Sequence, residues 1–203
     1  MKINFAIFLL CTSLLSSCTF IRFMNTKAIV NKTENEIISY LKDNNFSFYD
    51  YSFLLPMNNI DSLSQKNHAL DLWKLENQIE QSTIQIRVYD SLGHLINGYL
   101  QCYGNMNKLN ILSEKETKQF EWLPNNYSLM FSNELQLLNL SKEVEDDILL
   151  KNFQRRYTFV VYWNIWSNYF SKIMFVNLNK YLSKYQMKDN SLIIFVNTDN
   201  VQP

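Results

Sequence analysis

The chain has 203 residues, of which 47% are hydrophobic and 15% aromatic, and 19 basic residues balance 19 acidic ones. This length predicts one domain, and the apolar content is sufficient for its core. With zero net charge and no basic block, nucleic-acid binding through phosphate contacts is not expected.

The first 17 residues have the pattern of an export signal. Lys2 supplies a short positive region, and the apolar stretch 3–15 that follows is too short to span a bilayer stably. The segment ends in Leu15-Ser16-Ser17-Cys18, which resembles the lipobox of bacterial lipoproteins. That resemblance implies cleavage before Cys18 and its acylation, so residues 18–32 are expected to form a lipid anchor and tether. An ordinary cleaved signal, or a fortuitous cysteine, is the alternative.

The residues that follow Cys18 indicate where such an anchor would reside. Thr19, Phe20 and Ile21 include neither the aspartate linked to inner-membrane retention nor the acidic tract linked to surface display in some phyla. We therefore expect a periplasm-facing protein of the bacterial cell envelope, anchored on the outer membrane.

Cysteine content excludes one class of enzyme. Without the signal, Cys18 and Cys102 remain, and an acylated Cys18 cannot form a disulfide. Cys102 follows an apolar, strand-like stretch and is predicted to be a buried, inert thiol; an exposed thiol that pairs with a partner is the alternative. Thiol oxidoreductase activity that needs two cysteines is excluded.

Residues 33–203 are predicted to form a single α/β domain. Thr33 and Glu36 have capping-box spacing, which predicts a helix that runs to about residue 42. Segment 46–56 is aromatic and aliphatic without helical spacing and is predicted to be extended. A second short helix is expected at 70–79.

An antiparallel hairpin is predicted over 83–103. Ile84, Ile86 and Val88 alternate with polar residues, a period of two that directs one face towards a core. The turn 90–93 ends in Gly93, which tolerates a positive φ. Gly98, inside the return strand, indicates a bulge or a close neighbour.

The middle of the chain offers no clear metal or catalytic motif. Segments 135–140 and 148–153 are predicted to be short helical or irregular pieces, and the acidic run 143–147 between them lacks calcium-loop spacing and is expected to be a solvated face. His68 and His94 have no partner at a ligand spacing and are expected at the surface. We predict no cofactor and no metal.

A strand-helix-strand unit closes the chain. The continuous apolar run 157–163 predicts a strand buried on both faces, and 192–196 predicts another. Between them, Ser167 is predicted to cap a helix that ends near Asp189 and Asn190. Its expected inner face comprises Phe170, Ile173, Met174, Leu178, Tyr181, Leu182 and Tyr185. This arrangement predicts a βαβ unit with parallel strands.

The junction after the first of these strands resembles a thioredoxin active-site corner. Trp163 and Trp166 match the Trp-x-x-Trp that precedes Cys-x-x-Cys in that family, while Ser167 and Phe170 occupy the cysteine positions. The resemblance covers about residues 157–200, including the ending 196–199, which is similar to that of exported redoxin-type members. It implies a thioredoxin-like scaffold without disulfide exchange, because neither replacement can supply a thiolate.

The fold class expected from these elements is α/β (α+β), an incomplete or rearranged thioredoxin-like sheet. A complete member of the family continues with further helices and antiparallel strands, for which the residues up to 203 leave no room. The hairpin 83–103 is expected to take the place of those strands and to cover the sheet edge.

Three functions follow from these features. The first is an envelope-anchored binding or adaptor module that contacts a protein or peptide through Trp166, Asn168 and Tyr169, since aromatic anchors are common at binding hot spots. The second is an immunity or accessory lipoprotein of a toxin or peptide-export system. The third is a hydrolase in which Ser167 acts with His68 or His94, although no nucleophile motif accompanies them.

Overall fold

The computed structural model describes residues 32–55, 84–100 and 130–199. The signal, Cys18, most of the tether, the expected helix 70–79, His68 and Cys102 lie outside these ranges. The described elements are α3 (Glu34–Asp43), β1 (Tyr51–Leu54), β2 (Gln85–Asp90), β3 (Leu95–Leu100), α6 (Phe131–Leu137), α7 (Lys142–Gln154), β4 (Tyr157–Trp163), α8 (Asn168–Lys184), the 3₁₀ helix η3 (Lys188–Asn190) and β5 (Ser191–Asn197).

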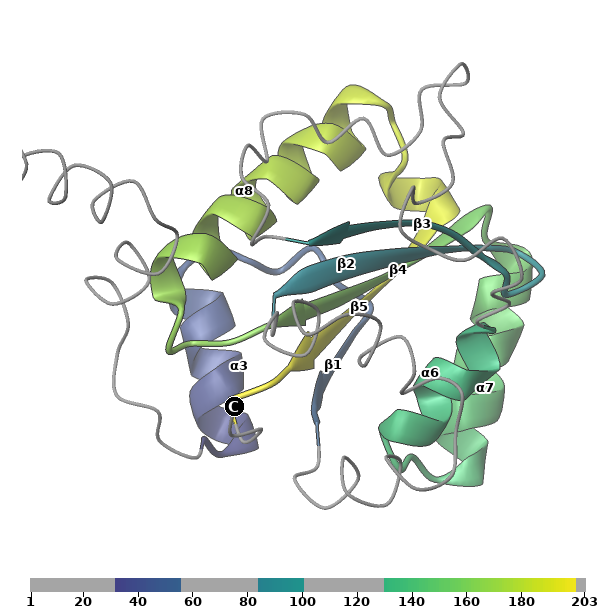
Figure 1. The fold of residues 1–203 in the computed structure, drawn as a ribbon, viewed down its shortest axis with the longest axis horizontal. Coiled ribbons are helices and arrows are strands. Elements are labelled where there is room, and N and C mark those ends of the chain that lie inside the picture. The colour runs from purple at the N-terminus through teal and green to yellow at the C-terminus, as the bar shows by residue number, and fades with distance from the viewer. Residues whose placement is uncertain (1–31, 56–83, 101–129, 200–203) are drawn as a thin grey trace, which may run out of the picture.

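The strands form one mixed sheet in the order β1-β5-β4-β2-β3 (Figure 1). β1, β5 and β4 are parallel, whereas β2 runs antiparallel to both β4 and β3. The mixed α/β class expected from the sequence is confirmed, and the predicted hairpin lies beside β4.

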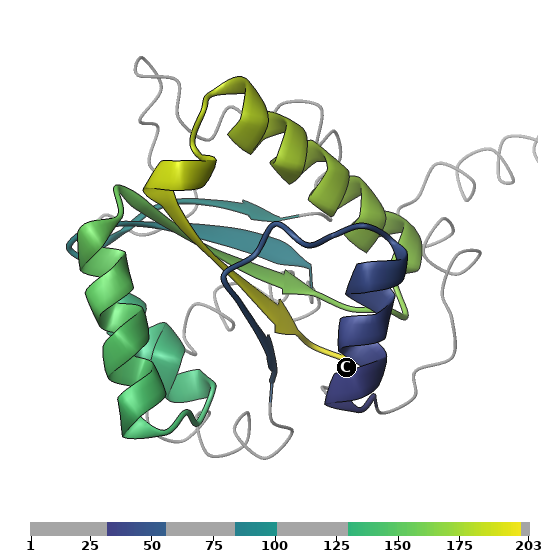
Figure 2. The same cartoon turned by 180° about the vertical axis from the view of Figure 1, so that it is seen from behind.

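Helices cover both faces of this sheet (Figures 1 and 2). Apolar side chains of α3 and α8 pack with Val161 and Phe195 on one face. Those of α6 and α7 pack with Val160 and Ile194 on the other. Successive residues of a strand point to opposite faces, so strands covered on both sides, such as β4 and β5, are expected to be mostly apolar. Their continuous apolar runs therefore fit burial on both sides.

The predicted βαβ unit is confirmed, with β4 and β5 parallel and in register from Tyr157 and Ser191 to Trp163 and Asn197. Two details of its helix need correction. Phe175, absent from the expected inner face, is fully buried, whereas Tyr185 is 49% exposed. The helix ends at Lys184, and the expected terminus at Asp189 and Asn190 belongs instead to η3. Tyr185 already follows the last helical turn, so the helical spacing does not direct it inwards.

The hairpin turn is built as expected around Gly93, whose φ of +82° favours glycine. The Gly93 carbonyl accepts a hydrogen bond of 2.7 Å from the backbone N–H of Phe131, where α6 begins. The register irregularity lies opposite Val88 and Tyr89, while Gly98 pairs regularly with Arg87. The turn thus joins the hairpin to the helix layer.

Three segments differ in extent from their predictions. The extended segment expected at 46–56 contains a strand of four residues, β1. Only residues 135–137 of the segment expected at 135–140 belong to a helix, α6, which begins earlier and ends at Leu137; the segment 148–153 lies within α7, which also begins earlier. α7 includes the acidic run 143–147, whose side chains are exposed or partly exposed. Ion pairs of Asp146 with Lys142 and of Asp147 with Lys151 stabilise it along the helix.

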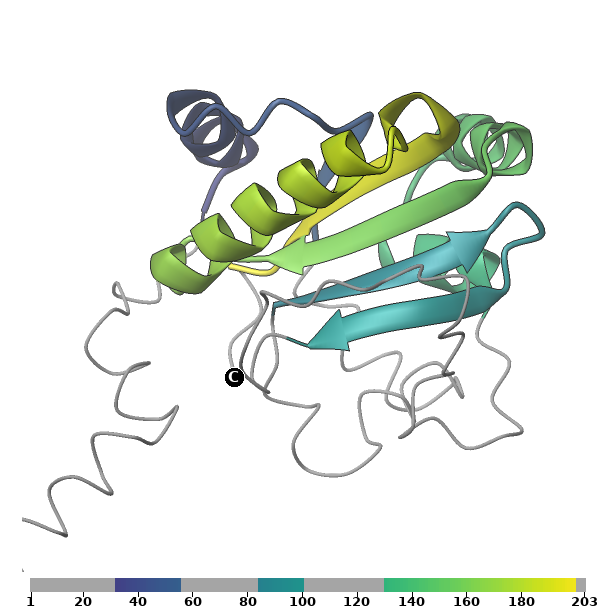
Figure 3. The same ribbon diagram turned by 90° about the horizontal axis from the view of Figure 1, so that it is seen from above.

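The two ends of the sheet differ in what surrounds them (Figure 3). The hairpin turn, the end of α7 and η3 gather at one end. The carboxyl ends of β4 and β5 lie at the other, beside α3 and the start of α8. Ligands of open α/β sheets bind at the carboxyl ends of parallel strands, so the second end is the place to seek a site.

Candidate functional site

The predicted corner, formed by residues 163–170, lies where β4 leads into α8. Trp163 is fully buried; its ring stacks on Tyr40 of α3 at 5.4 Å between ring centroids and meets Phe175 edge-on at 5.3 Å. Trp166 is 4% exposed and Ser167 5%. Most of the corner is thus packed inside the domain.

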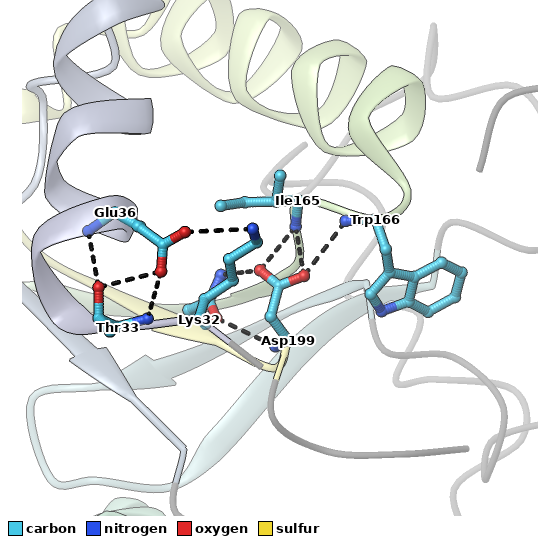
Figure 4. A network of polar contacts seen from close by, with 7 residues as sticks. Lys32, Thr33, Glu36, Ile165, Trp166 and Asp199 are labelled. Carbon is cyan, nitrogen blue, oxygen red and sulfur yellow. Dashed lines mark hydrogen bonds and ion pairs between the residues drawn. The ribbon is translucent and has the colours of Figure 1, made fainter. Parts of the chain in front are cut away.

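A buried carboxylate holds the loop of this corner (Figure 4). Asp199, just after β5, accepts hydrogen bonds from the backbone N–H groups of Ile165, at 2.8 Å, and Trp166, at 3.2 Å. The side-chain amide of Asn197 donates a third at 2.7 Å. The loop conformation is therefore coupled to the neighbouring strand.

The environment of Asp199 opposes its ionisation. Burial raises the pKa of this carboxyl above its ordinary value of 3.8, and the hydrogen bonds from Asn197, Ile165 and Trp166 offset this effect only in part. Burial, together with the nearby Asp199, also raises the pKa of Tyr40, so its phenol stays neutral and can donate to Asn168.

Asn164 and Ser171 form a second set of contacts around the start of α8. The Asn164 side-chain oxygen accepts the backbone N–H of Ser167 at 2.8 Å, and the Ser171 hydroxyl donates to the Asn164 carbonyl at 2.7 Å. Ser167 occupies the N-cap position, but its side chain makes no capping hydrogen bond. The expected capping role of the Ser167 side chain is therefore wrong: the Ser167 carbonyl, and not its hydroxyl, accepts the backbone N–H groups of Phe170 and Ser171.

Of the three side chains predicted to contact a partner, Tyr169 is the most accessible, with 49% of its surface exposed. Asn168 is partly exposed and accepts the hydrogen bond of Tyr40. Trp166 is almost fully buried. Phe170, partly buried, meets Tyr169 edge-on at 5.4 Å between ring centroids. The exposed part of the corner is thus centred on Tyr169.

The structure separates two of the residues considered for hydrolysis. Ser167 follows the end of β4, whereas His94 lies in the turn next to Asp90, which pairs with Tyr157 at the start of β4. A seven-residue strand spans roughly 20 Å, so His94 cannot take a proton from Ser167. Within the described ranges, no cluster of His, Cys, Asp and Glu could hold a metal ion.

The face of the sheet under α6 buries a charged cluster that sequence reasoning missed. Glu134 on α6 is 1% exposed, and its carboxylate accepts hydrogen bonds from the Arg87 guanidinium and from the hydroxyls of Tyr89 and Tyr162. Arg87 also donates to the Gln85 side chain at 3.3 Å. We call these five residues the Glu134 cluster.

The two phenols and the guanidinium of the Glu134 cluster are held in their ordinary protonation states. Burial, and then the Glu134 carboxylate, raise the pKa of Tyr89 and of Tyr162 well above the ordinary phenol value. Burial, the largest single influence, would lower the pKa of Arg87, but Glu134, Tyr162 and Tyr89 together outweigh it and raise that pKa. Both phenols therefore remain donors and the guanidinium remains charged. A carboxylate with three internal donors is suited to holding α6 on the sheet.

No family model, curated protein or solved structure matches the chain. Among the helices that the structure describes, none is both long and apolar enough to cross a membrane.

Proposed function

We propose that this protein is a bacterial envelope lipoprotein whose domain is a rearranged, redox-inactive thioredoxin-like fold that serves as a binding or adaptor module. The anchor would be Cys18, and the partner a protein or peptide that contacts the corner. The observation that carries the proposal is the construction of that corner. Its loop is fixed by Asp199, yet Ser167 and Phe170 stand where the thioredoxin family, which the corner resembles, has reactive cysteines.

The sheet order supports the thioredoxin-like part of the proposal. The hairpin β2–β3 lies antiparallel beside β4. In the thioredoxin family, the same position is taken by antiparallel strands that follow the βαβ unit in the chain. Here they precede it in the chain, which is the sense in which the fold is rearranged.

Binding at the corner is supported by an exposed aromatic side chain that stands on a firmly held backbone. Tyr169 projects from the first turn of α8, and that turn is held by the contacts of Asn164, Ser171 and Asp199. An aromatic side chain on a fixed backbone loses little conformational entropy when a partner covers it. Such residues commonly dominate binding energy.

The test is site-specific photo-crosslinking from position 169 in the native envelope, combined with the Tyr169→Ala variant. The same changes at Tyr185 provide the control, because both tyrosines belong to the α8 region and both are 49% exposed. We expect one partner to crosslink at 169 and not at 185, and Tyr169→Ala to weaken its binding at least tenfold, as for a hot spot.

Equal crosslinking from both positions, or unchanged binding by Tyr169→Ala, would contradict a partner site at the corner. Trp166→Ala is a poorer variant, since removal of a buried indole is expected to destabilise the domain. The anchor is tested separately by measuring the mass of the mature amino terminus, which should carry acyl chains on Cys18 and should lose them in Cys18→Ser.

A further inference from the structure

α8 carries a ridge of positive charge that the proposed function does not use. Lys172, Val176, Lys180 and Lys184 follow one another at four-residue intervals and therefore lie on one side of the helix. The opposite side, which includes Phe175, Leu178 and Leu182, is packed on the sheet. We call these four residues the lysine ridge. α8 lies along the sheet (Figure 3), and Lys180 and Lys184 on the ridge are exposed.

The charges of the ridge are not compensated along its helix. Residues 148–188 contain seven Lys or Arg and no Asp or Glu, although the whole chain is neutral. Within the described residues, the three lysines of the ridge form no ion pair, whereas Lys142 and Lys151 of α7 each pair with an aspartate four residues away. Like charges four residues apart disfavour a helix, so helix stability does not account for this pattern.

We propose that the lysine ridge lies on a membrane surface rich in anionic phospholipid. Lysine is a compact charge on a flexible stem and suits a diffuse negative surface, whereas arginine provides the directional, bidentate contacts typical of a specific protein partner. The three cations of α8 are all lysines. Val176 lies between Lys172 and Lys180, is 41% exposed, and adds apolar surface to the ridge.

The inference deepens the proposed function, because an anchor at Cys18 would keep the domain near a membrane. The proposed membrane contact is confined to the last three turns of α8. The first turn carries Tyr169 and lies beside α3, whose acidic residues Glu34, Glu36 and Asp43 would disfavour an anionic surface. Tyr169 lies seven residues before Val176 and therefore on the same side of α8, so contact through the ridge would bring Tyr169 to the edge of the membrane surface.

The test places a nitroxide label at Val176→Cys in the full-length protein after purification from its membranes, with Cys102 replaced by serine. Val144→Cys on α7 is the matched control, since it is the same residue type, is 36% exposed and belongs to the helix layer of the opposite face. The protein is reconstituted in vesicles of phosphatidylcholine, with and without phosphatidylglycerol. Accessibility to a water-soluble relaxation agent is then measured.

We expect the label at 176, and not that at 144, to be protected in vesicles with phosphatidylglycerol and to lose protection at high salt. Each lysine is expected to contribute roughly fivefold to the equilibrium. The triple variant Lys172→Gln, Lys180→Gln, Lys184→Gln should therefore weaken the contact about a hundredfold, whereas Lys142→Gln, Lys151→Gln should not.

Equal accessibility at both positions, or protection that is the same in vesicles without phosphatidylglycerol, would overturn the proposal. Protection in native envelopes but not in anionic vesicles would assign the ridge to an acidic protein instead and would also overturn it. An unmodified Cys18 would remove the anchor of the proposed function, yet the ridge is then tested by adding the labelled Cys18→Ser protein to preformed vesicles, because a free Cys18 would also take the label.

Discussion

Glu134 and Asp199 are both buried carboxylates, but they are held by different kinds of donor. Glu134 is bound by a guanidinium and two phenols on neighbouring strands, whereas Asp199 is bound by two loop N–H groups and a carboxamide. The first arrangement joins a helix to a sheet through charge, and the second fixes a loop largely with neutral donors. A buried carboxylate thus stabilises the scaffold in one region and fixes the candidate site in the other.

Removal of the Glu134 charge is expected to have the largest effect. Glu134→Gln leaves Arg87 buried without its anionic partner, and loss of one partner of a buried ion pair typically costs about 3–5 kcal/mol of unfolding free energy. Urea unfolding at neutral pH measures the change.

A double variant separates an unpaired charge from lost packing. Arg87→Met, Glu134→Leu removes both charges and should be less destabilised than Glu134→Gln alone, because no buried ion remains without a partner. If the double variant is the less stable of the two, Arg87 does not depend on Glu134 and the contrast with Asp199 fails.

Asp199→Asn is expected to have a smaller effect that depends on pH. The side-chain oxygen of an amide can still accept hydrogen bonds from the loop N–H groups. We therefore expect the unfolding free energy to fall by only about 1 kcal/mol at neutral pH. The pKa of Asp199 is raised in the folded protein, so the folded state binds the proton more tightly than the unfolded state. The stability contribution of Asp199 is therefore greatest at low pH and declines as pH rises from 3.8 through the folded pKa.

The measurement is the difference in unfolding free energy between the wild type and Asp199→Asn across this range. The wild type should become more stable relative to Asp199→Asn as the pH falls from neutral. A difference that stays constant, or that shrinks, would mean that the carboxylate is not disfavoured by its surroundings.

Replacement of Asp147 is expected to have the smallest effect on the unfolding free energy. Like Glu134, Asp147 is bound by a cation and a phenol, but it lies at the surface. Its carboxylate accepts from Tyr51 and from Lys151, whose side chain is 44% exposed. Water screens such pairs, so Asp147→Asn should unfold within experimental error of the wild type. A loss comparable to that of Glu134→Gln would show that partner chemistry, and not burial, determines the cost.

The sequence predicted best those elements in which buried apolar residues recur at a regular interval. The apolar runs of β4 and β5, the spacing of Met174, Leu178 and Leu182 in α8 and the alternation in β2 each report a packed face. Gly93 and the capping box of Thr33 and Glu36 are local signals, and the structure has both.

The Glu134 cluster could not be predicted in the same way. Gln85 and Arg87 are polar, so the alternation of β2 indicated a face in water, whereas both side chains are buried. Arg87 is 47 residues from Glu134, and a pair at that distance has no spacing signal. The role of Asp199 was hidden for a related reason: an acid after a buried strand was visible, but not the loop amides that it would meet.

The pairing of β1 with β5 has a kinetic consequence. Asp50 accepts the backbone N–H of Ile193, 143 residues further along the chain, and β1 then continues in parallel with β5 up to Leu54. β1 cannot pair before β5 exists, and closure of so long a loop is slow. A chain that emerges amino end first, as every newly made chain does, would therefore carry the aromatic side chains of Tyr51 and Phe53 without their β5 neighbours until almost all of it has emerged, which is the interval in which a chaperone would matter most.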